Sequence, residues 1–281
     1  MTVVLGLIAA FCWGVPDVPL AVAVRRVGEL SVLIGSLAIG LAVVTPIVIA
    51  TGPPHLTERG LLIAAVAAAV TVAAYLTAFT AFQNCPVSVV TPILSCEGAV
   101  AAVIAVAGGE HLSAWLVVLL AAAVAGVILV GAGTGDGSRA HLRGIGYVSL
   151  AALLWGCVLA LGSPVSHELG VWWGFLAVRA LTLVLAIAVA AVARKGRAVL
   201  PALRAEPWRI AIWGLGDTAA YLCFYLAVHR GPAAVADVLA AQFATFGSLA
   251  GVLLLGERLR RVQWAGVAIV IAAVSGISAL G

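Results

Sequence analysis

The chain has 281 residues, of which 64% are hydrophobic and only 9% charged, and its formal net charge is +4. Soluble domains are typically about 45–50% apolar and about 25% charged, and even a large soluble domain leaves much of its surface in water. The composition therefore excludes a soluble globular fold and indicates a protein that crosses a membrane many times.

Apolar stretches long enough to cross a bilayer follow one another along the whole chain. A spanning helix needs about 20 mostly apolar residues. The strands of a membrane β-barrel would instead alternate apolar and polar residues, which the nearly continuous apolar run at 61–72 does not do. We therefore predict an all-α polytopic membrane protein with ten transmembrane helices. They lie near residues 3–24, 30–50, 60–82, 87–107, 113–132, 144–162, 172–193, 208–229, 233–255 and 262–280.

The two halves of the chain carry the same short motifs in the same order, at offsets of 142 to 147 residues. The matched motifs are Trp13-Gly14 with Trp155-Gly156, Ala-Ala-Tyr-Leu at 73–76 with 219–222, Cys-Pro at 85–86 with Gly-Pro at 231–232, and Gly-Glu-His-Leu at 109–112 with Gly-Glu-Arg-Leu at 256–259. Each copy would hold five helices, an odd number, so the second copy must cross the membrane in the opposite sense. We predict two inverted five-helix repeats, residues 1–135 and 136–281, an architecture that places substrate sites near the membrane midplane between the halves.

The same motifs carry a resemblance to a known family. Trp13-Gly14, the Gly-Pro pair at 231–232 and the Gly-Glu-Arg-Leu motif at 256–259 with its weaker copy at 109–112 resemble the ten-helix, EamA-like members of the drug/metabolite transporter superfamily. The resemblance covers essentially the whole chain. It implies a transporter that carries a small metabolite or drug by alternating access, and it does not fix the substrate. Asp17 and Glu97 are not general features of that family and mark a subgroup.

Cationic residues gather in alternate loops. Twelve of the 15 Lys and Arg residues fall in the odd-numbered loops, Arg59 and Arg230 fall in the even-numbered loops, and Arg179 lies inside a span. The positive-inside rule then places the odd loops in the cytoplasm and both termini outside, whereas transporters that the chain resembles usually have both termini inside. We expect a multi-pass protein of the plasma or inner membrane. The positive net charge comes mostly from the basic residues of these loops and does not imply nucleic-acid binding.

Ionisable side chains within the spans are candidates for function, because each costs at least about 2.5–3.5 kcal/mol to insert. Glu97 lies at the middle of the fourth stretch, near a helix break expected at Pro92, and is our candidate for substrate binding and proton coupling. The alternative is a buried acid neutralised by Arg179 or by protonation. Asp217 is the natural partner for Arg179, and if these two residues pair, Glu97 is the free acid.

Further candidates lie in the first and sixth stretches. Asp17 stands between Pro16 and Pro19, which should break the first helix, and discontinuous helices recur at the substrate sites of transporters. The alternative is that the helix ends here and that Asp17 faces headgroup water. Trp13 and Trp155 are matched by the repeat and lie too deep for an interfacial belt. Cavity lining and core packing are both compatible with that depth.

Two aromatic stripes are matched by the repeat. Asp217, Tyr221 and Tyr225 share one helical face, and Tyr75 is the counterpart of Tyr221. These stripes are expected either to wall a central cavity or to pack at a helix interface. Asp237 and Gln242 add polar groups to the ninth stretch. Our substrate-binding candidates are Trp13, Asp17, Tyr75, Glu97, Trp155, Asp217, Tyr221 and Gln242.

Other features are given structural roles. Glu110 and Glu257 lie at helix boundaries, where we expect them to hold a loop amide or an arginine across the repeat. The Gly- and Ala-rich fifth and tenth helices suit close packing within the chain or a homodimer face. The cysteines and histidines show neither CxxC spacing nor convergence, so we expect no metal and no cofactor.

Three classes of membrane protein remain, with a transporter first. No Gly-Lys-Ser/Thr phosphate-binding motif is present, so ion or proton coupling or exchange must drive transport. Four buried acids against one buried base favour a cationic or amine-bearing small molecule as substrate. An integral-membrane enzyme acting on a lipid-linked substrate is the alternative, although such enzymes cluster Asp, His, Arg or Lys at one membrane face. A channel or membrane scaffold is the third class.

Overall fold

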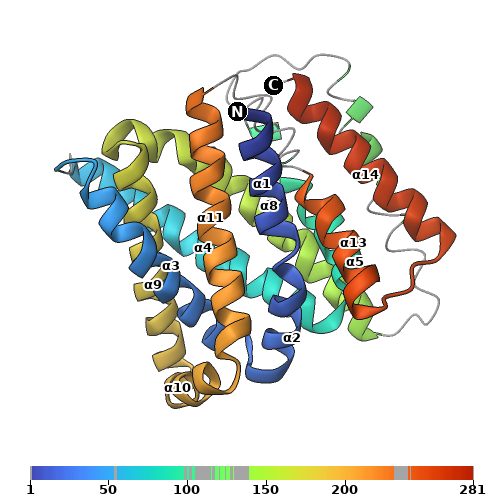
Figure 1. Ribbon diagram of the computed structural model, residues 1–281, viewed down its shortest axis with the longest axis horizontal. Coiled ribbons are helices and arrows are strands. Elements are labelled where there is room, and N and C mark those ends of the chain that lie inside the picture. The colour runs from blue at the N-terminus through green and yellow to red at the C-terminus, as the bar shows by residue number, and fades with distance from the viewer. Residues whose placement is uncertain are drawn as a thin grey trace.

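Runs of Ala, Val, Leu and Ile fold into helices here because a backbone inside lipid must satisfy its own hydrogen bonds. In the computed structural model these helices form one bundle (Figure 1), and the described residues contain no β-strand. The structure describes residues 2–53, 56–97, 100, 103–104, 115, 118–119, 121–123, 125–126, 129, 139–230, 240 and 242–280. The helices are α1 Thr2–Gly14, α2 Asp17–Val27, α3 Glu29–Ile49, α4 Glu58–Asn84, α5 Val87–Leu94, α8 Arg139–Leu169, α9 Val171–Val192, α10 Gly196–Ala205, α11 Pro207–Arg230, α13 Phe243–Leu255 and α14 Arg261–Leu280.

Five segments of the described chain are long and apolar enough to cross a membrane. They are Val3–Val27, Glu29–Ile49, Glu58–Asn84, Leu142–Leu169 and Val171–Val192. Each lies where the sequence predicts a spanning helix, so in the described residues the all-helical part of the prediction is confirmed. The predicted stretch 113–132, the motif at 109–112, the Gly-Pro pair at 231–232 and Asp237 lie wholly or mostly outside the described residues, as does the Tyr225 side chain.

Two predicted helix breaks are present. The first span divides between Gly14 and Asp17, because the chain turns at Pro16 before α2 begins. In the fourth stretch, α5 ends at Leu94, and a turn at Ser95 and Cys96 separates it from Glu97. The Ser95 hydroxyl donates to the carbonyl of Pro92 at 2.8 Å in this turn.

One helix was not predicted. Residues 196–205, which the sequence places in a charged loop, form α10 on the end of the bundle opposite the two termini (Figure 1). Its ten residues are too few to span a membrane, so a search for spanning stretches passes over it. Ala202 on its inner face is buried, whereas Leu200 on the outer face is 56% exposed.

The main helix pairs each take one helix from each predicted half. α1 lies against α11, α4 against α8, α3 against α9, and α5 against α13. Glycines make possible the close approach of α13 to α5 and a further approach of α11 to α3. A Cβ at Gly214 would lie 2.8 Å from the carbonyl oxygen of Ser36, and one at Gly247 would lie 2.5 Å from the Thr91 side chain. Small residues at such contacts are typical of membrane helix packing.

Consecutive loops lie at opposite ends of the bundle. At one end, Lys195 pairs with Glu29 at 3.0 Å, and Arg25 donates to the carbonyl oxygens of Phe82 and Cys85, each at 2.8 Å. At the other end, the Trp173 indole donates to the carbonyl of Gly52 at 3.0 Å, and Thr57 and Arg59 contact Glu168. The odd-numbered loops that are described therefore share one end, as alternating spans require.

Glu257 fastens one half of the chain to the other. Its carboxylate accepts the backbone N–H groups of Val87 and Ser88, each at 2.8 Å, and the Ser88 hydroxyl at 2.6 Å. These N–H groups open α5 and have no acceptor within that helix. The expectation that Glu257 holds a loop amide across the repeat is confirmed, and Glu110 lies outside the described residues.

Candidate functional site

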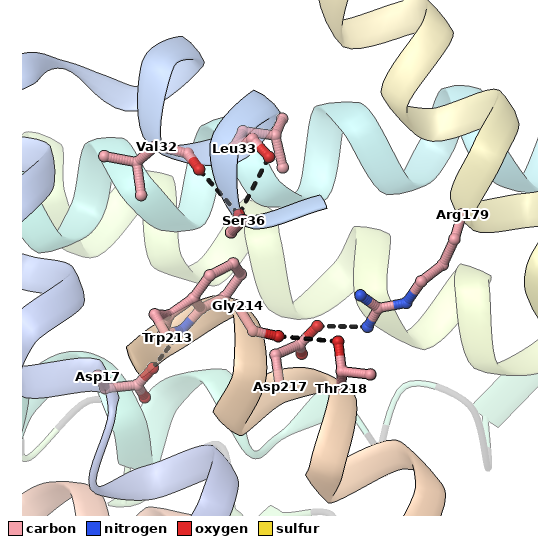
Figure 2. A network of polar contacts seen from close by, with 9 residues as sticks. All are labelled: Asp17, Val32, Leu33, Ser36, Arg179, Trp213, Gly214, Asp217 and Thr218. Carbon is pink, nitrogen blue, oxygen red and sulfur yellow. Dashed lines mark hydrogen bonds and ion pairs between the residues drawn. The ribbon is translucent and has the colours of Figure 1, made fainter. Parts of the chain in front are cut away.

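A buried ion pair joins α9 to α11. Arg179 and Asp217 are 5% and 6% exposed, and the guanidinium donates directly to the carboxylate (Figure 2). The same guanidinium lies 4.9 Å from the ring centres of both Phe175 and Tyr221. An unpaired guanidinium is costly at this depth. The ion pair removes this cost, because each charge compensates the other. The predicted Arg179–Asp217 pair is confirmed.

Gly40 of α3 has no side chain and therefore leaves room for this ion pair. A Cβ at Gly40 would lie 2.4 Å from the Thr218 hydroxyl and 3.3 Å from an Arg179 nitrogen. Thr218 itself donates back to the carbonyl of Gly214 at 2.8 Å, so its hydroxyl is satisfied within α11. The Arg179–Asp217 ion pair of the second half of the chain thus lies directly against α3 of the first half.

Asp17 lies beside the ion pair. It is 7% exposed, and the indole nitrogen of Trp213 donates to its carboxylate at 3.3 Å. Figure 2 shows Asp17, Trp213, Asp217 and Arg179 following one another between α2 and α9. This burial excludes the alternative in which Asp17 faces headgroup water. We call these four residues the polar centre.

Trp213 was not among the sequence candidates, although a signal for it exists. It precedes Asp217 by four positions in α11, so the two side chains share a face of the helix. A tryptophan one turn from a buried acid is a ready hydrogen-bond donor, because its N–H needs a partner when it is buried.

Two edge-to-face ring contacts flank the polar centre. Trp13 meets Tyr221 with 5.1 Å between ring centroids and an interplanar angle of 88°, and Tyr75 meets Trp155 at 4.8 Å and 89°. Tyr75 also lies 5.7 Å from Trp213, ring to ring. The structure therefore brings these four sequence candidates into two matching pairs, one of which contacts Trp213 of the polar centre.

Glu97 lies directly after the turn that ends α5. Its side chain is half-buried, and among the described residues it makes no hydrogen bond and no ion pair. A Cβ at Gly156 would lie 2.9 Å from the Glu97 carbonyl oxygen, so this backbone touches α8 next to Trp155. Because Arg179 is committed to Asp217, the alternative in which Arg179 neutralises Glu97 is wrong.

Gln242 contacts side chains of α13 and α14. Its amide nitrogen donates to the Ser275 hydroxyl of α14 at 2.6 Å, and its oxygen accepts from Thr245 at 3.2 Å. These contacts tie it to α13 and α14 rather than to the polar centre. Within the part of the chain that the structure describes, no three His, Cys, Asp or Glu side chains are placed to hold a metal ion.

A bundle of apolar helices around a buried, charged centre is typical of a polytopic membrane transporter. The model of the EamA-like transporter family matches residues 1–132 and 142–279, so the chain belongs to this family and is a multi-pass membrane protein of the drug/metabolite transporter type. A solved structure titled "Crystal structure of protein" covers 100% of this chain and 99% of its own, with a TM-score of 0.62 and 12% identity, a likeness that shows the fold alone. No curated protein matches significantly.

Proposed function

We propose that the protein is a secondary-active transporter of the cell membrane that moves a small organic solute by alternating access. Its ten helices form two inverted halves, residues 1–135 and 136–281, which rock about a midplane site. Two separate family matches, one in each half, support this division. The pairing of α1 with α11 and of α4 with α8 supports it further, because a two-fold axis that exchanges the halves would relate the two pairs.

The observation that carries the proposal is the crossed arrangement of the aromatic pairs. Trp13 of the first half contacts Tyr221 of the second, and Trp155 of the second contacts Tyr75 of the first. Tyr221 of one pair lies against Arg179, and Tyr75 of the other lies against Trp213. Both pairs therefore adjoin the polar centre, whose own residues come from both halves. A solute bound between the pairs would touch both halves at once, as alternating access requires.

The charges favour an amine-bearing or cationic solute. Arg179 is neutralised by Asp217, whereas Asp17 and Glu97 have no basic partner among the described residues. A cation would satisfy these acids, and the neighbouring Trp and Tyr rings add favourable faces for it.

Proton coupling at Glu97 would supply the driving force. A carboxyl group without a basic partner can release its proton when a cationic solute arrives and regain it when the solute leaves, which makes solute and proton compete for one site. The break in the helix before Glu97 supports this role, because backbone exposed at membrane depth is tolerated only beside protein or a watery cavity.

The test begins with a screen of amine-bearing compounds for those that raise the melting temperature of the purified protein. Flux of a compound so identified is then measured in proteoliposomes with and without a pH gradient. Glu97→Gln should abolish the dependence on the gradient, whereas Glu58→Gln, at an exposed acid in the first turn of α4, should keep it. Gradient-driven flux that is unchanged in Glu97→Gln would remove Glu97 from the coupling role.

A further inference from the structure

The short helix α10 presents an exposed, basic face at one end of the bundle. It connects α9 to α11. The turn between α9 and α10 is sharp, and Arg194 in this turn has a positive φ of 57°. Its inner face packs on α3, where Leu203 approaches Gly35. On the outer face Arg197, Leu200 and Arg204 are exposed.

The length of α9 places this face at the membrane surface. Its 22 residues span about 33 Å at 1.5 Å per residue, close to the thickness of the hydrocarbon core. Val192 at its end is apolar and 86% exposed, as lipid contact requires, and Arg194 follows two residues later. Leu200 of α10 and Trp208 near the start of α11 are 56% and 53% exposed. Apolar side chains beside arginines are typical of a helix that lies in the headgroup layer.

The basic residues on this face are not neutralised by the protein. The nearby acids are already engaged, because Glu29 pairs with Lys195 and Glu206 pairs with Arg26 and Arg209. Among the described residues, Arg194, Arg197 and Arg204 make no ion pair. Three exposed guanidinium groups are therefore left to an external anion.

Two of these arginines line one hollow. Ala191, Arg194, Gly196 and Arg197 line an open space of about 570 Å³ at the corner between α9 and α10. The lining residues include two arginines and no acid. A guanidinium binds a phosphate through two parallel N–H···O bonds, so this lining suits a phosphate group that approaches from the headgroup layer.

We propose that this hollow binds the headgroup phosphate of an anionic phospholipid. Arg194 and Arg197 contact the phosphate, Arg204 extends the basic surface along α10, and Leu200 rests among the upper acyl-chain carbons. The site is separate from the transport site, so its occupancy changes the stability of the protein without supplying transported solute.

The test uses the full-length protein purified in detergent. It is titrated with dioctanoyl phosphatidylglycerol, with dioctanoyl phosphatidylcholine and with inorganic phosphate, and binding is read from the melting temperature and from lipid retained in native mass spectrometry. Arg194→Gln, Arg197→Gln and Arg204→Gln are combined in one variant. The control combines Arg258→Gln, Arg260→Gln and Arg261→Gln, which remove the same charge from exposed positions before and at the start of α14.

The wild-type protein should bind phosphatidylglycerol in preference to the other two probes. At about 1 kcal/mol for each basic residue, the α10 variant should bind it on the order of 100-fold more weakly, and the α14 control should bind it nearly as well as wild type. Equal losses in both variants, or none in the α10 variant, would overturn the site. Equal binding of inorganic phosphate would show that the lipid is not the ligand.

Discussion

Trp13 meets Tyr221 edge to face across the two halves of the chain, with 5.1 Å between ring centroids. The residues at matching positions in the repeat, Trp155 and Tyr75, make the same contact in the reverse sense at 4.8 Å. One Trp from each half thus rests on a Tyr of the other. Because the interplanar angles are 88° and 89°, the two contacts are nearly identical in geometry.

Equal contacts should have equal energetic effects. Trp13→Ala and Trp155→Ala each remove a ring pair worth about 0.5–1.5 kcal/mol beyond its buried area, so both should lower the melting temperature in detergent by similar amounts. Trp208→Ala is the control, because Trp208 is 53% exposed near the start of α11 and should change the melting temperature little. A large effect from only one of these two half-buried tryptophans would contradict the matched roles.

The buried pair Arg179–Asp217 should be sensitive to the loss of either partner. Asp217→Asn or Arg179→Gln leaves one charge uncompensated, which costs about 3–5 kcal/mol for a buried pair. The double variant Arg179→Met with Asp217→Leu removes both charges and should regain much of the stability. Reversible unfolding in mixed micelles measures all three variants. A double variant no better than the single ones would show that the two side chains act separately.

Glu257 should stabilise the contact between the halves at the end where the odd-numbered loops meet. Glu257→Gln replaces a charged acceptor of three hydrogen bonds with a neutral amide, and hydrogen bonds to charged groups contribute about 1.5–3 kcal/mol each. We expect faster hydrogen exchange at the Val87 and Ser88 amides, because glutamine offers one neutral oxygen where the carboxylate offers each amide its own charged oxygen. Exchange at the start of α4 should not change. Unaltered protection at Val87 and Ser88 would mean that these amides do not depend on the carboxylate.

Glu206, between α10 and α11, should make the stability of the protein depend on pH. Its hydrogen bond from Arg26, helped by Arg209, lowers the pKa of this carboxyl below the usual 4.5. The native state therefore favours the ionised form, and this stabilisation is complete above the unfolded pKa and is lost as pH falls through the lower native value. Melting temperatures between pH 6 and pH 3 should fall more steeply for wild type than for Glu206→Gln. Parallel curves would contradict the coupling.

Much of the polar centre could be predicted from charge alone. One arginine and a few acids inside a chain with 9% charged residues leave few possible partners, so the Arg179–Asp217 pair follows from the cost of burying a lone charge. The helix breaks near Pro16 and Pro92 likewise follow from local chemistry, because proline removes a backbone donor.

The remaining features depend on how the helices pack. The hydrogen bond from Trp213 to Asp17 joins residues 196 positions apart, and no local pattern fixes that pairing. The repeat relates Trp13 to Trp155 but does not say that each contacts the tyrosine of the other half. Gln242 was a reasonable polar candidate, yet its place at the start of α13 directs it to Ser275. The amphipathic helix α10 was not predicted because it is too short to span the membrane.

Opposite motions at the two ends of the bundle are the most direct test of alternating access. In a variant whose five cysteines are replaced by serine, spin labels at Asn84 and Arg258 report the separation of the halves at one end. Labels at Glu58 and His167 report it at the other. In lipid nanodiscs at pH 5.5 and pH 8.5, our account predicts two populations at each end, with one separation growing as the other shrinks. Distances that stay fixed at both ends, or that change together, would contradict it.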